Sequence, residues 1–353
     1  MEIDKIDSNL KIKTDIKKDG IRFYSCKEKF FELNGLMSCK AGESFSRLPA
    51  EIAKNTNPGV ESLNSHTAGG RLRFKVKTNY MAIIAQTVNM SKMPHMPFSG
   101  SIGFDAYEYS SGRQTYICSF IPPVDITDKF EAEYNFTDER EREIIINFPL
   151  YGGVRELYIG LPEDTEIKAP HEYKINKPVV YYGSSITQGG CASRPGNSYQ
   201  AIISRKLDCD YINLGFSGSA KGENAIAEYI SKLKMSAFVY DYDHNAPTRE
   251  HLLNTHKPMF DIIRKANPYL PIVMLSRPDF FKSEERDARF EIIKRTYDIA
   301  KSGGDENVYL INGGDIMQGA AEDNGTVDGC HPNDLGFYSM AQKIGDLLKK
   351  ILM

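Results

Sequence analysis

The sequence has 353 residues, of which 41% are hydrophobic and 26% are charged, as in ordinary globular proteins. This length exceeds the usual size of one hydrophobic core, so two domains are expected. The net charge of −3 and the pI near 6.2 give no electrostatic reason to expect nucleic acid or an anionic membrane as a partner. The amino terminus lacks the apolar core of a signal peptide, and no later run is long enough to cross a bilayer, so we expect a cytoplasmic protein.

Cofactor and metal motifs are missing from the sequence. The six cysteines are scattered without a CxxC pair, and such thiols are more often small buried hydrophobic residues than disulfide partners or zinc ligands. Asp241 and Asp243 have no histidine or cysteine at metal-ligand spacing. The glycine-rich stretch 183–190 has neither a P-loop ending nor a GxGxxG pattern. We therefore expect no disulfide, no metal site and no cofactor.

The first 161 residues alternate hydrophobic and polar side chains with a period of two, which is typical of half-buried antiparallel strands. Glycine and proline turn signals separate these runs at the spacing of a β-sandwich. The expected strands are 21–31, 71–77, 81–88, 114–121, 130–136, 144–150 and 156–161. We predict an antiparallel β-sandwich of jelly-roll type for residues 1–172, with the charged stretch 162–177 as linker to the next domain.

Beyond the linker, strand-like and helix-like segments alternate. The expected strands are 179–183, 210–214, 236–241, 271–276 and 307–312, and the expected helices are 198–207, 223–233, 248–266, 284–302 and 334–351. Alternation of this kind requires a mostly parallel sheet with helices on both faces. We predict a three-layer α/β/α domain with a five-stranded parallel sheet for residues 178–353.

A strand followed by a tight turn of small residues, VVYYGSSITQGG (179–190), displays the hydroxyl of Ser185 at the carboxyl edge of that sheet. A serine needs a neighbouring base to become a nucleophile. Near the carboxyl terminus, VDGCHPND places Asp328 three residues before His331, ahead of the last helix, where Asn333 or Asp334 could act as the cap. This spacing lets the carboxylate orient the imidazole as base, with Ser185 as nucleophile.

Acyl transfer also requires donors aimed at a developing oxyanion. The segment INLGFSGSAKG follows the second parallel strand and DYDHNAP follows the third. We predict an oxyanion hole formed by the backbone amides of Ser185 and Gly218 and the side-chain amide of Asn245. Gly218 and Asn245 are also common turn residues, and the two roles are compatible.

Four motifs, GSSIT (183–187), GFSG (215–218), the asparagine of DHNAP and DGCH (328–331), resemble the four blocks of the SGNH, or GDSL-type, hydrolase superfamily. This resemblance covers about residues 178–352 and implies a flavodoxin-like sheet. It assigns Ser185 as nucleophile, Gly218 and Asn245 as oxyanion donors, and His331 and Asp328 as base and acid.

A narrower resemblance includes GFDAY (103–107), which is similar to the signature of SGNH esterases with an amino-terminal GxDLY-type sandwich. Ala106 stands where that signature has leucine, and Ser184 stands where the wider superfamily has aspartate. The resemblance points to Asp105 and Tyr107 as substrate-binding residues.

Two further residues and one stretch each allow two interpretations of their role. Arg194 could hold a substrate oxygen or form a structural ion pair. His244 could contact substrate or simply pack within its loop. The stretch MSKMPHMP (90–97) has the residue types of a copper site, but two prolines favour a loop lying over an apolar surface.

The expected function is a serine esterase acting on small acyl groups, with acetyl on a sugar or oligosaccharide as the substrate that the resemblance implies. An acyltransferase that uses the same serine and a non-catalytic carbohydrate-binding protein stay open as alternatives. The expected partner is a small-molecule or oligosaccharide ester, without nucleic acid or membrane, and a homo-oligomer is left open.

Overall fold

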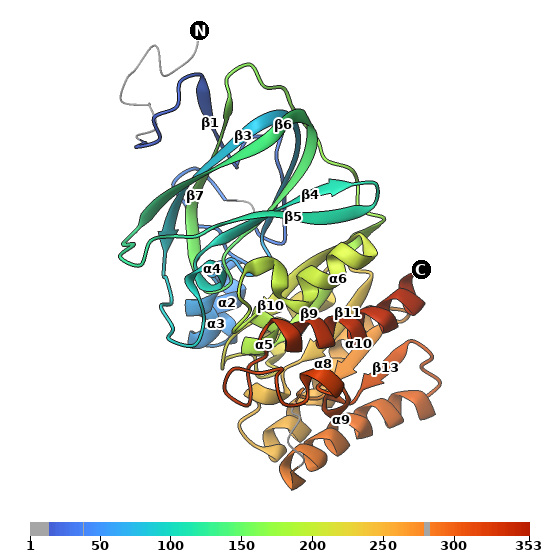
Figure 1. The fold of residues 1–353 in the computed structure, drawn as a ribbon. Helices are drawn as coiled ribbons and strands as arrows, with labels where there is room; N and C mark the ends of the chain where they lie inside the picture. The colour runs from blue at the N-terminus through green and yellow to red at the C-terminus, as the bar shows by residue number, and fades with distance from the viewer. Residues whose placement is uncertain (1–13, 38, 279–282) are drawn as a thin grey trace.

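The computed structural model describes residues 14–37, 39–278 and 283–353. An antiparallel β-domain formed by the amino-terminal half of the chain lies against an α/β domain formed by the carboxyl-terminal half (Figure 1). No helix within the described ranges is long and apolar enough to cross a membrane. The order predicted from hydrophobic periodicity, with antiparallel strands in the first half of the chain and a parallel sheet in the second, is confirmed.

Within the described residues, the β-domain is one eight-stranded sheet in the order β1-β7-β3-β6-β4-β5, with β2 and β8 also pairing with β3. Its strands are β1 (Ile21–Ser25), β2 (Glu32–Asn34), β3 (Arg71–Val88), β4 (Phe104–Ser110), β5 (Arg113–Phe120), β6 (Lys129–Asn147), β7 (Gly153–Pro162) and β8 (Ile167–Lys168). The separate sheets of a jelly roll are replaced by one continuous sheet, because β3 and β6 pair with each other from end to end. The register shifts only between Thr78 and Tyr80, so two segments that the sequence predicted as separate strands are one.

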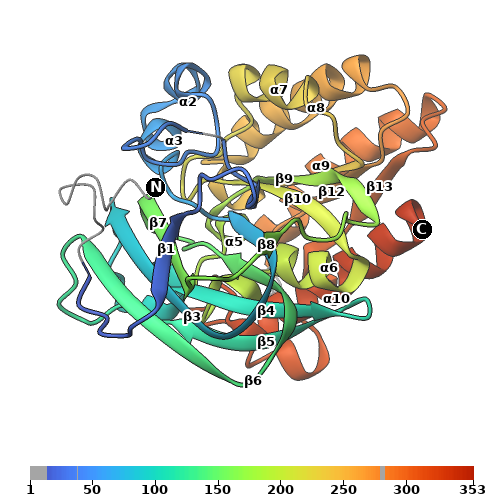
Figure 2. The ribbon, with the colours of Figure 1, turned by 90° about the horizontal axis from the view of Figure 1, so that it is seen from above.

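The α/β domain contains, in the described part of the chain, a five-stranded parallel sheet in the order β10-β9-β11-β12-β13. Its strands are β9 (Ile175–Gly183), β10 (Cys209–Gly215), β11 (Ala237–Asp241), β12 (Ile272–Leu275) and β13 (Val308–Ile311), and its main helices are α6 (Tyr199–Leu207), α7 (Asn224–Ser231), α8 (Arg249–Ala266), α9 (Glu284–Ser302) and α10 (Asp334–Leu352). Helices α6 and α10 cover one face, and α7, α8 and α9 cover the other (Figure 2).

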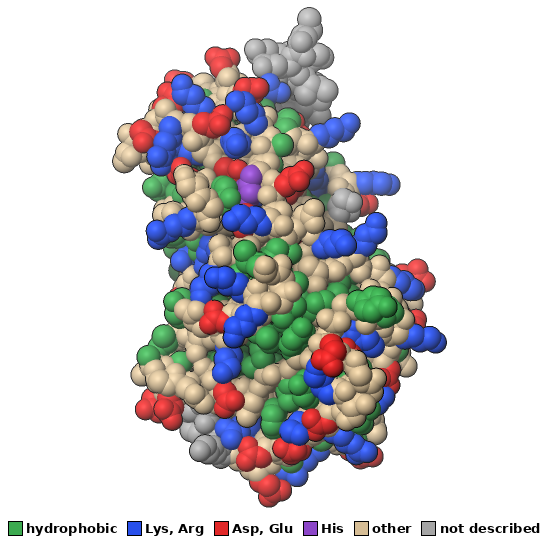
Figure 3. All heavy atoms as spheres, turned by 90° about the vertical axis from the view of Figure 1, so that its right-hand side faces the viewer, with side chains coloured by type: hydrophobic (Ala, Val, Ile, Leu, Met, Phe, Trp, Pro, Cys, Tyr) green, Lys and Arg blue, Asp and Glu red, His purple; other side chains and the backbone are tan. Residues whose placement is uncertain are grey.

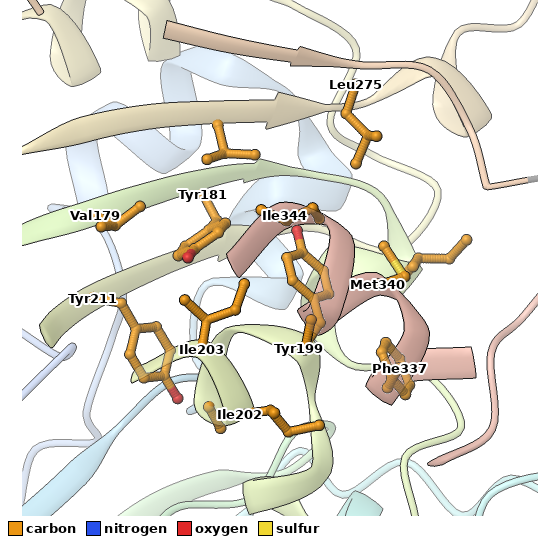
Figure 4. Close-up of a cluster of buried hydrophobic side chains, with 14 of the residues drawn as sticks. Val179, Tyr181, Tyr199, Ile202, Ile203, Tyr211, Leu275, Phe337, Met340 and Ile344 are labelled. Carbon is orange, nitrogen blue, oxygen red and sulfur yellow. The ribbon is translucent and has the colours of Figure 1, made fainter. Parts of the chain in front are cut away.

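Strand β9, which lies between β10 and β11, is apolar on both faces because both are covered. Val179 and Tyr181 join the cluster formed with α6 and α10, where Tyr181 lies edge-on to Tyr199 (Figure 4). Val180 and Tyr182 point the other way, into the cluster under α7 and α8. Burial on alternate faces fixes the register of the strand, since a slip of one residue would exchange the two sets.

The ends of the long helices match the predicted ones within two residues, and side-chain caps explain why. Thr248 accepts from the amide of His251 at the start of α8, and Asn333 accepts from the amides of Leu335 and Gly336 at the start of α10. A cap satisfies amides that have no partner inside the helix. Of the two residues expected to cap the last helix, Asn333 is therefore the one that does so.

Two helices in the amino-terminal half, α2 (Ala50–Thr56) and α3 (Pro58–Leu63), were not predicted. They leave the β-domain and pack on the α/β domain, where Ala53 and Val60 are buried in the same cluster as Ile226 and Ile230 of α7. Part of the boundary between the two domains is therefore apolar.

The face of the molecule shown in Figure 3 carries Lys and Arg side chains intermixed with Asp and Glu over both domains. This mixture agrees with the small net charge and forms no patch of one sign on that face. Hydrophobic side chains gather over part of the α/β domain there.

Candidate active site

The short helix α5 (Ser185–Gln188) begins directly after β9, with Ser184 as its cap. The Ser184 hydroxyl accepts from the amide of Ile186 at 3.2 Å, so a serine performs a capping function where the wider superfamily has aspartate. Gly183 is required at the turn, because a Cβ there would lie 2.2 Å from Oγ1 of Thr187 and 2.3 Å from the carbonyl oxygen of Asp241. This tight turn places Ser185 at the carboxyl end of β9.

Ser185 and His331, which are 146 residues apart in the sequence, meet at this edge. The Ser185 Oγ lies 2.9 Å from Nε2 of His331, and Nδ1 of the same ring lies 2.8 Å from Oδ2 of Asp328. Ser185 is 9% exposed, so most of its surface is covered by the surrounding protein. The arrangement is that of a nucleophile, a base and an orienting acid.

Asp328 is held in its charged form. Its partial burial alone would raise the pKa, but hydrogen bonds from the backbone amide and ring of His331, and from the amide of Cys330, lower the pKa of Asp328 to about 2. The carboxylate therefore fixes the Nδ1–H tautomer of His331 and leaves Nε2 free to accept the serine proton.

The predicted oxyanion donors come from loops at the same edge, because β9 pairs with β10 on one side and β11 on the other. Gly183 is opposite both Gly215 and Asp241, so the chain leaves all three strands at one level. The Nδ2 group of Asn245 donates to the carbonyl oxygen of Phe216 at 2.9 Å, which ties its loop to the loop of Gly218. Gly218 has a φ of +65°, the left-handed conformation that favours glycine.

Gln188, the last residue of α5, connects these loops, a role that no motif in the sequence indicates. Its Oε1 accepts from the backbone amide of Ser217 at 3.0 Å, and its Nε2 donates to the carbonyl oxygen of Leu150 at 3.0 Å. The same Nε2 lies 3.1 Å from Nδ1 of His66, whose pKa is lowered to about 4 by burial and then by nearby Arg47, so that ring is neutral and able to accept. The fully buried amide of Gln188 thus has partners for both its oxygen and its nitrogen.

Tyr151 is a second contact that the sequence did not indicate. This residue lies in the β-domain segment between β6 and β7, and its hydroxyl donates to the carbonyl oxygen of Ser185 at 3.2 Å. Gly190 lies beside it, where a Cβ would be 2.8 Å from the Tyr151 oxygen and 3.4 Å from Cδ2 of His331. The β-domain therefore reaches the backbone of the nucleophile turn itself.

The two aspartates near the end of β11 have structural partners. Asp243 accepts from Arg289 of α9 at 3.1 Å and from the backbone amide of Arg277 at 3.0 Å. Arg289 also donates to the carbonyl oxygens of Asp243 and Ala246, so it holds the loop that carries Asn245.

Asp241 is fully buried, and burial and then the nearby Asp243 raise its pKa well above the ordinary range. Among the described residues, no group of three or more possible ligands could hold a metal ion.

Arg194, Asp105 and Tyr107 form a contact between the domains instead of the predicted substrate-binding group. Arg194 donates to Oδ2 of Asp105 at 2.8 Å and to the hydroxyl of Tyr107. Asp105 is fully buried and also accepts from the Asn147 side chain and the Gly196 amide, at 2.8 and 2.9 Å. With both carboxylate oxygens in use, the structural ion pair is the reading that the geometry supports.

His244 contacts the residue that precedes the base, with its Nδ1 3.8 Å from Sγ of Cys330. Burial, followed by the charges of Arg277 and His331, lowers the pKa of His244 to about 3, so this ring is neutral. The contact places it among the residues that surround His331, and its predicted contact with substrate stays a prediction.

Comparisons with known proteins identify the family to which the chain is similar. Residues 176–349 match the model of the GDSL-like lipase/acylhydrolase family, and residues 21–167 match the GxDLY model, described as the N-terminus of SGNH-hydrolase-type esterases. Among curated proteins, none is similar enough in sequence to match.

Three solved structures resemble the chain over most of its length. A protein described as a GDSL-like lipase from Bacteroides ovatus is 28% identical, with a TM-score of 0.84, and the match covers 94% of this chain and 98% of that one. A salicylyl-acyltransferase from a tetracycline biosynthetic pathway is 18% identical, with a TM-score of 0.77 and coverage of 96% and 100%. An acetyl xylan esterase from Butyrivibrio proteoclasticus is 13% identical, with a TM-score of 0.58 and coverage of 94% and 98%. At such identities, the last two show a shared fold alone.

The two family models match consecutive parts of the chain. The part that matches the GDSL-like lipase/acylhydrolase model contains the serine, histidine and aspartate that meet in the structure. The chain therefore belongs to the GDSL-like lipase/acylhydrolase family of carboxylic ester hydrolases and carries a GxDLY-type amino-terminal domain.

Proposed function

We propose that the protein is a serine esterase in which Ser185 attacks the ester carbonyl while His331 accepts its proton. The single observation that supports this most strongly is the 2.9 Å contact between Ser185 Oγ and His331 Nε2, with Asp328 on the opposite nitrogen. The attack forms a tetrahedral oxyanion, which the amides of Ser185 and Gly218 and the side chain of Asn245 stabilise in this proposal.

The remaining steps use the same histidine twice. His331 gives its proton to the departing alcohol as the C–O bond breaks, leaving an acyl group on Ser185. A water molecule then loses a proton to His331 and attacks the acyl-enzyme, which releases the acid and restores the serine hydroxyl. Asp328 stays ionised throughout, because its pKa of about 2 lies far below neutral pH.

For the substrate we propose a small acyl ester, with acetyl on a sugar or oligosaccharide as the preferred class. This choice is supported by the fold shared with an acetyl xylan esterase. A family two carbohydrate esterase from Clostridium thermocellum, solved with cellohexaose, also shares the fold at a TM-score of 0.59 and 14% identity.

An acyltransferase is the second candidate, favoured by the likeness of fold to the salicylyl-acyltransferase over 96% of this chain. Such an enzyme would use the same serine and oxyanion donors but transfer the acyl group to an alcohol. Product analysis with and without an added alcohol acceptor separates the two, since an esterase releases free acid in both cases.

The decisive experiment for catalysis compares hydrolysis of p-nitrophenyl acetate by the wild type, Ser185→Ala and His331→Ala. We expect both variants to lose about three orders of magnitude in kcat/KM or more while keeping the wild-type circular dichroism spectrum. Equal rates in all three proteins would leave only the non-catalytic carbohydrate-binding alternative.

A further inference from the structure

An exposed histidine of the β-domain lies beside the base of the catalytic group. The ring of His95 is centred 6.0 Å from the ring of His331, and the two planes are inclined by 47°. His95 belongs to the segment between β3 and α4 (Phe98–Ser101), whereas His331 lies ahead of α10. Its side chain is exposed, so nothing in the fold requires an imidazole at this position for packing.

The segment that carries His95 is anchored on both sides of that residue. Before it, the amide of Ser91 donates to the carbonyl oxygen of Tyr151 at 3.0 Å, and Nζ of Lys92 donates to the carbonyl oxygen of Ile126 at 2.9 Å. After it, Met96 is 2% exposed and joins the same buried cluster as Tyr151. The predicted loop over an apolar surface is thus present, and it holds His95 in place instead of leaving it to move freely.

The next residues press this segment onto the loop that follows the nucleophile. Ser99 donates to the carbonyl oxygen of Ser193 at 2.6 Å. At Gly100 a Cβ would lie 2.1 Å from the carbonyl oxygen of Ala192, so only glycine permits the close approach. The segment that carries His95 is therefore held in a defined position beside Ser185 and His331.

We propose that His95 binds a hydroxyl group on the alcohol part of the ester, next to the bond that breaks. This inference rests on the proposed function and adds a substrate preference to it. His331 must protonate the departing oxygen, so the alcohol part lies alongside its ring during the reaction. The ring centres are 6.0 Å apart, so the oxygen that His331 protonates and an oxygen on the neighbouring carbon of the same alcohol can each lie within hydrogen-bonding distance of one ring.

The chemistry of an imidazole side chain matches such a hydroxyl. One ring nitrogen donates and the other accepts, and a hydroxyl group does both. A site built to bind a hydroxyl discriminates against an analogue that lacks it, because its own polar group is then left without a partner. His95 thereby favours polyhydroxylated alcohols, such as sugars or glycerol, over simple alkyl alcohols.

Two acetate esters test the proposal directly: glycerol monoacetate and propyl acetate, which share acyl group and carbon chain and differ in the hydroxyl groups. We expect the wild type to prefer glycerol monoacetate, and His95→Ala to lower kcat/KM for it by about five- to tenfold, the effect of one lost hydrogen bond. For propyl acetate the same variant should stay within about twofold of the wild type. His95→Gln, which keeps a donor and an acceptor, should recover part of the loss.

Equal effects of His95→Ala on both esters, or no effect on either, would overturn the proposal, as would a wild type without preference for the hydroxylated ester. Activity on p-nitrophenyl acetate that depends on Ser185 but not on His95 would leave the proposed esterase intact in that case. Activity that is independent of Ser185 would instead refute the esterase, so the two failures are distinguishable.

Discussion

The side-chain oxygen of Gln188 accepts a hydrogen bond from the backbone amide of Ser217, at 3.0 Å. Gln188 ends the nucleophile helix, and Ser217 precedes the proposed oxyanion donor Gly218, so this bond fixes the two loops relative to each other. The nitrogen of the same amide donates to Leu150 of the β-domain, which makes the second domain part of the support for the site.

Replacement of Gln188 by leucine should therefore lower kcat more than it changes KM. Loss of the acceptor frees the Ser217 amide and lets the Gly218 amide drift from its position, and we expect kcat to fall by about 10- to 100-fold. Gln188→Glu keeps an acceptor for Ser217 and should retain more activity than leucine. Steady-state kinetics on p-nitrophenyl acetate, with melting curves to account for lost stability, provide the measurement. A rise in KM alone would show that Gln188 serves binding instead.

Asp328 gives a prediction for stability as well as for rate. Its folded pKa of about 2 lies below the ordinary value of 3.8, so its stabilising effect is present above pH 3.8 and is lost as pH falls through about 2. The side chain is 39% exposed, and after allowance for solvent screening we expect Asp328→Asn to cost about 1 kcal/mol at pH 7. The difference between variant and wild type should shrink toward zero near pH 2.

Denaturant unfolding of both proteins at pH 7 and at pH 2.5 measures this difference. The same variant should lose about two orders of magnitude or more in kcat at pH 7, because His331 loses the group that fixes its tautomer. A stability difference that persists unchanged at the acid end would show that the effect comes from packing and not from the charge.

Substitution of Arg194 distinguishes a structural role of this residue from a role in substrate binding. Arg194→Met leaves the carboxylate of Asp105, which is 0% exposed, without its cationic partner, and we expect a loss of about 3 kcal/mol in unfolding free energy. Adding Asp105→Asn to this variant should restore part of the stability, since the buried charge is then removed. KM for p-nitrophenyl acetate should stay within about twofold in the folded variants. A large rise in KM with unchanged stability would return Arg194 to the substrate site.

The α/β domain could be predicted almost completely from the sequence, because its strands are buried on both faces and its long helices begin at capping residues such as Thr248 and Asn333. The β-domain could be predicted less well. Polar residues near Thr78 have the pattern of a turn, yet β3 runs through them with a shift in register. Pairing with β6 along the whole length outweighs this local signal.

Within the candidate site, the meeting of Ser185 with His331 followed from the order of motifs along a parallel sheet. The contacts of Gln188 with Leu150 and of Tyr151 with Ser185 did not, because they depend on how the two domains pack. The contact of Gln188 with Ser217 lies within the α/β domain and depends on the conformations of two loops. The motif that contains Asp105 predicts a substrate-binding residue, whereas the side chain is fully buried and accepts from Arg194 and from the Gly196 amide of the other domain.

Covalent labelling with a fluorophosphonate tests the central claim most directly, because the reagent forms a phosphorus–oxygen bond with an activated serine and releases fluoride. Peptide mapping by mass spectrometry should find the adduct on Ser185 in the wild type, much slower labelling in His331→Ala, and none at that position in Ser185→Ala. An adduct on a different serine, or no adduct on a folded protein that still hydrolyses p-nitrophenyl acetate, would contradict the assignment of Ser185 as the nucleophile.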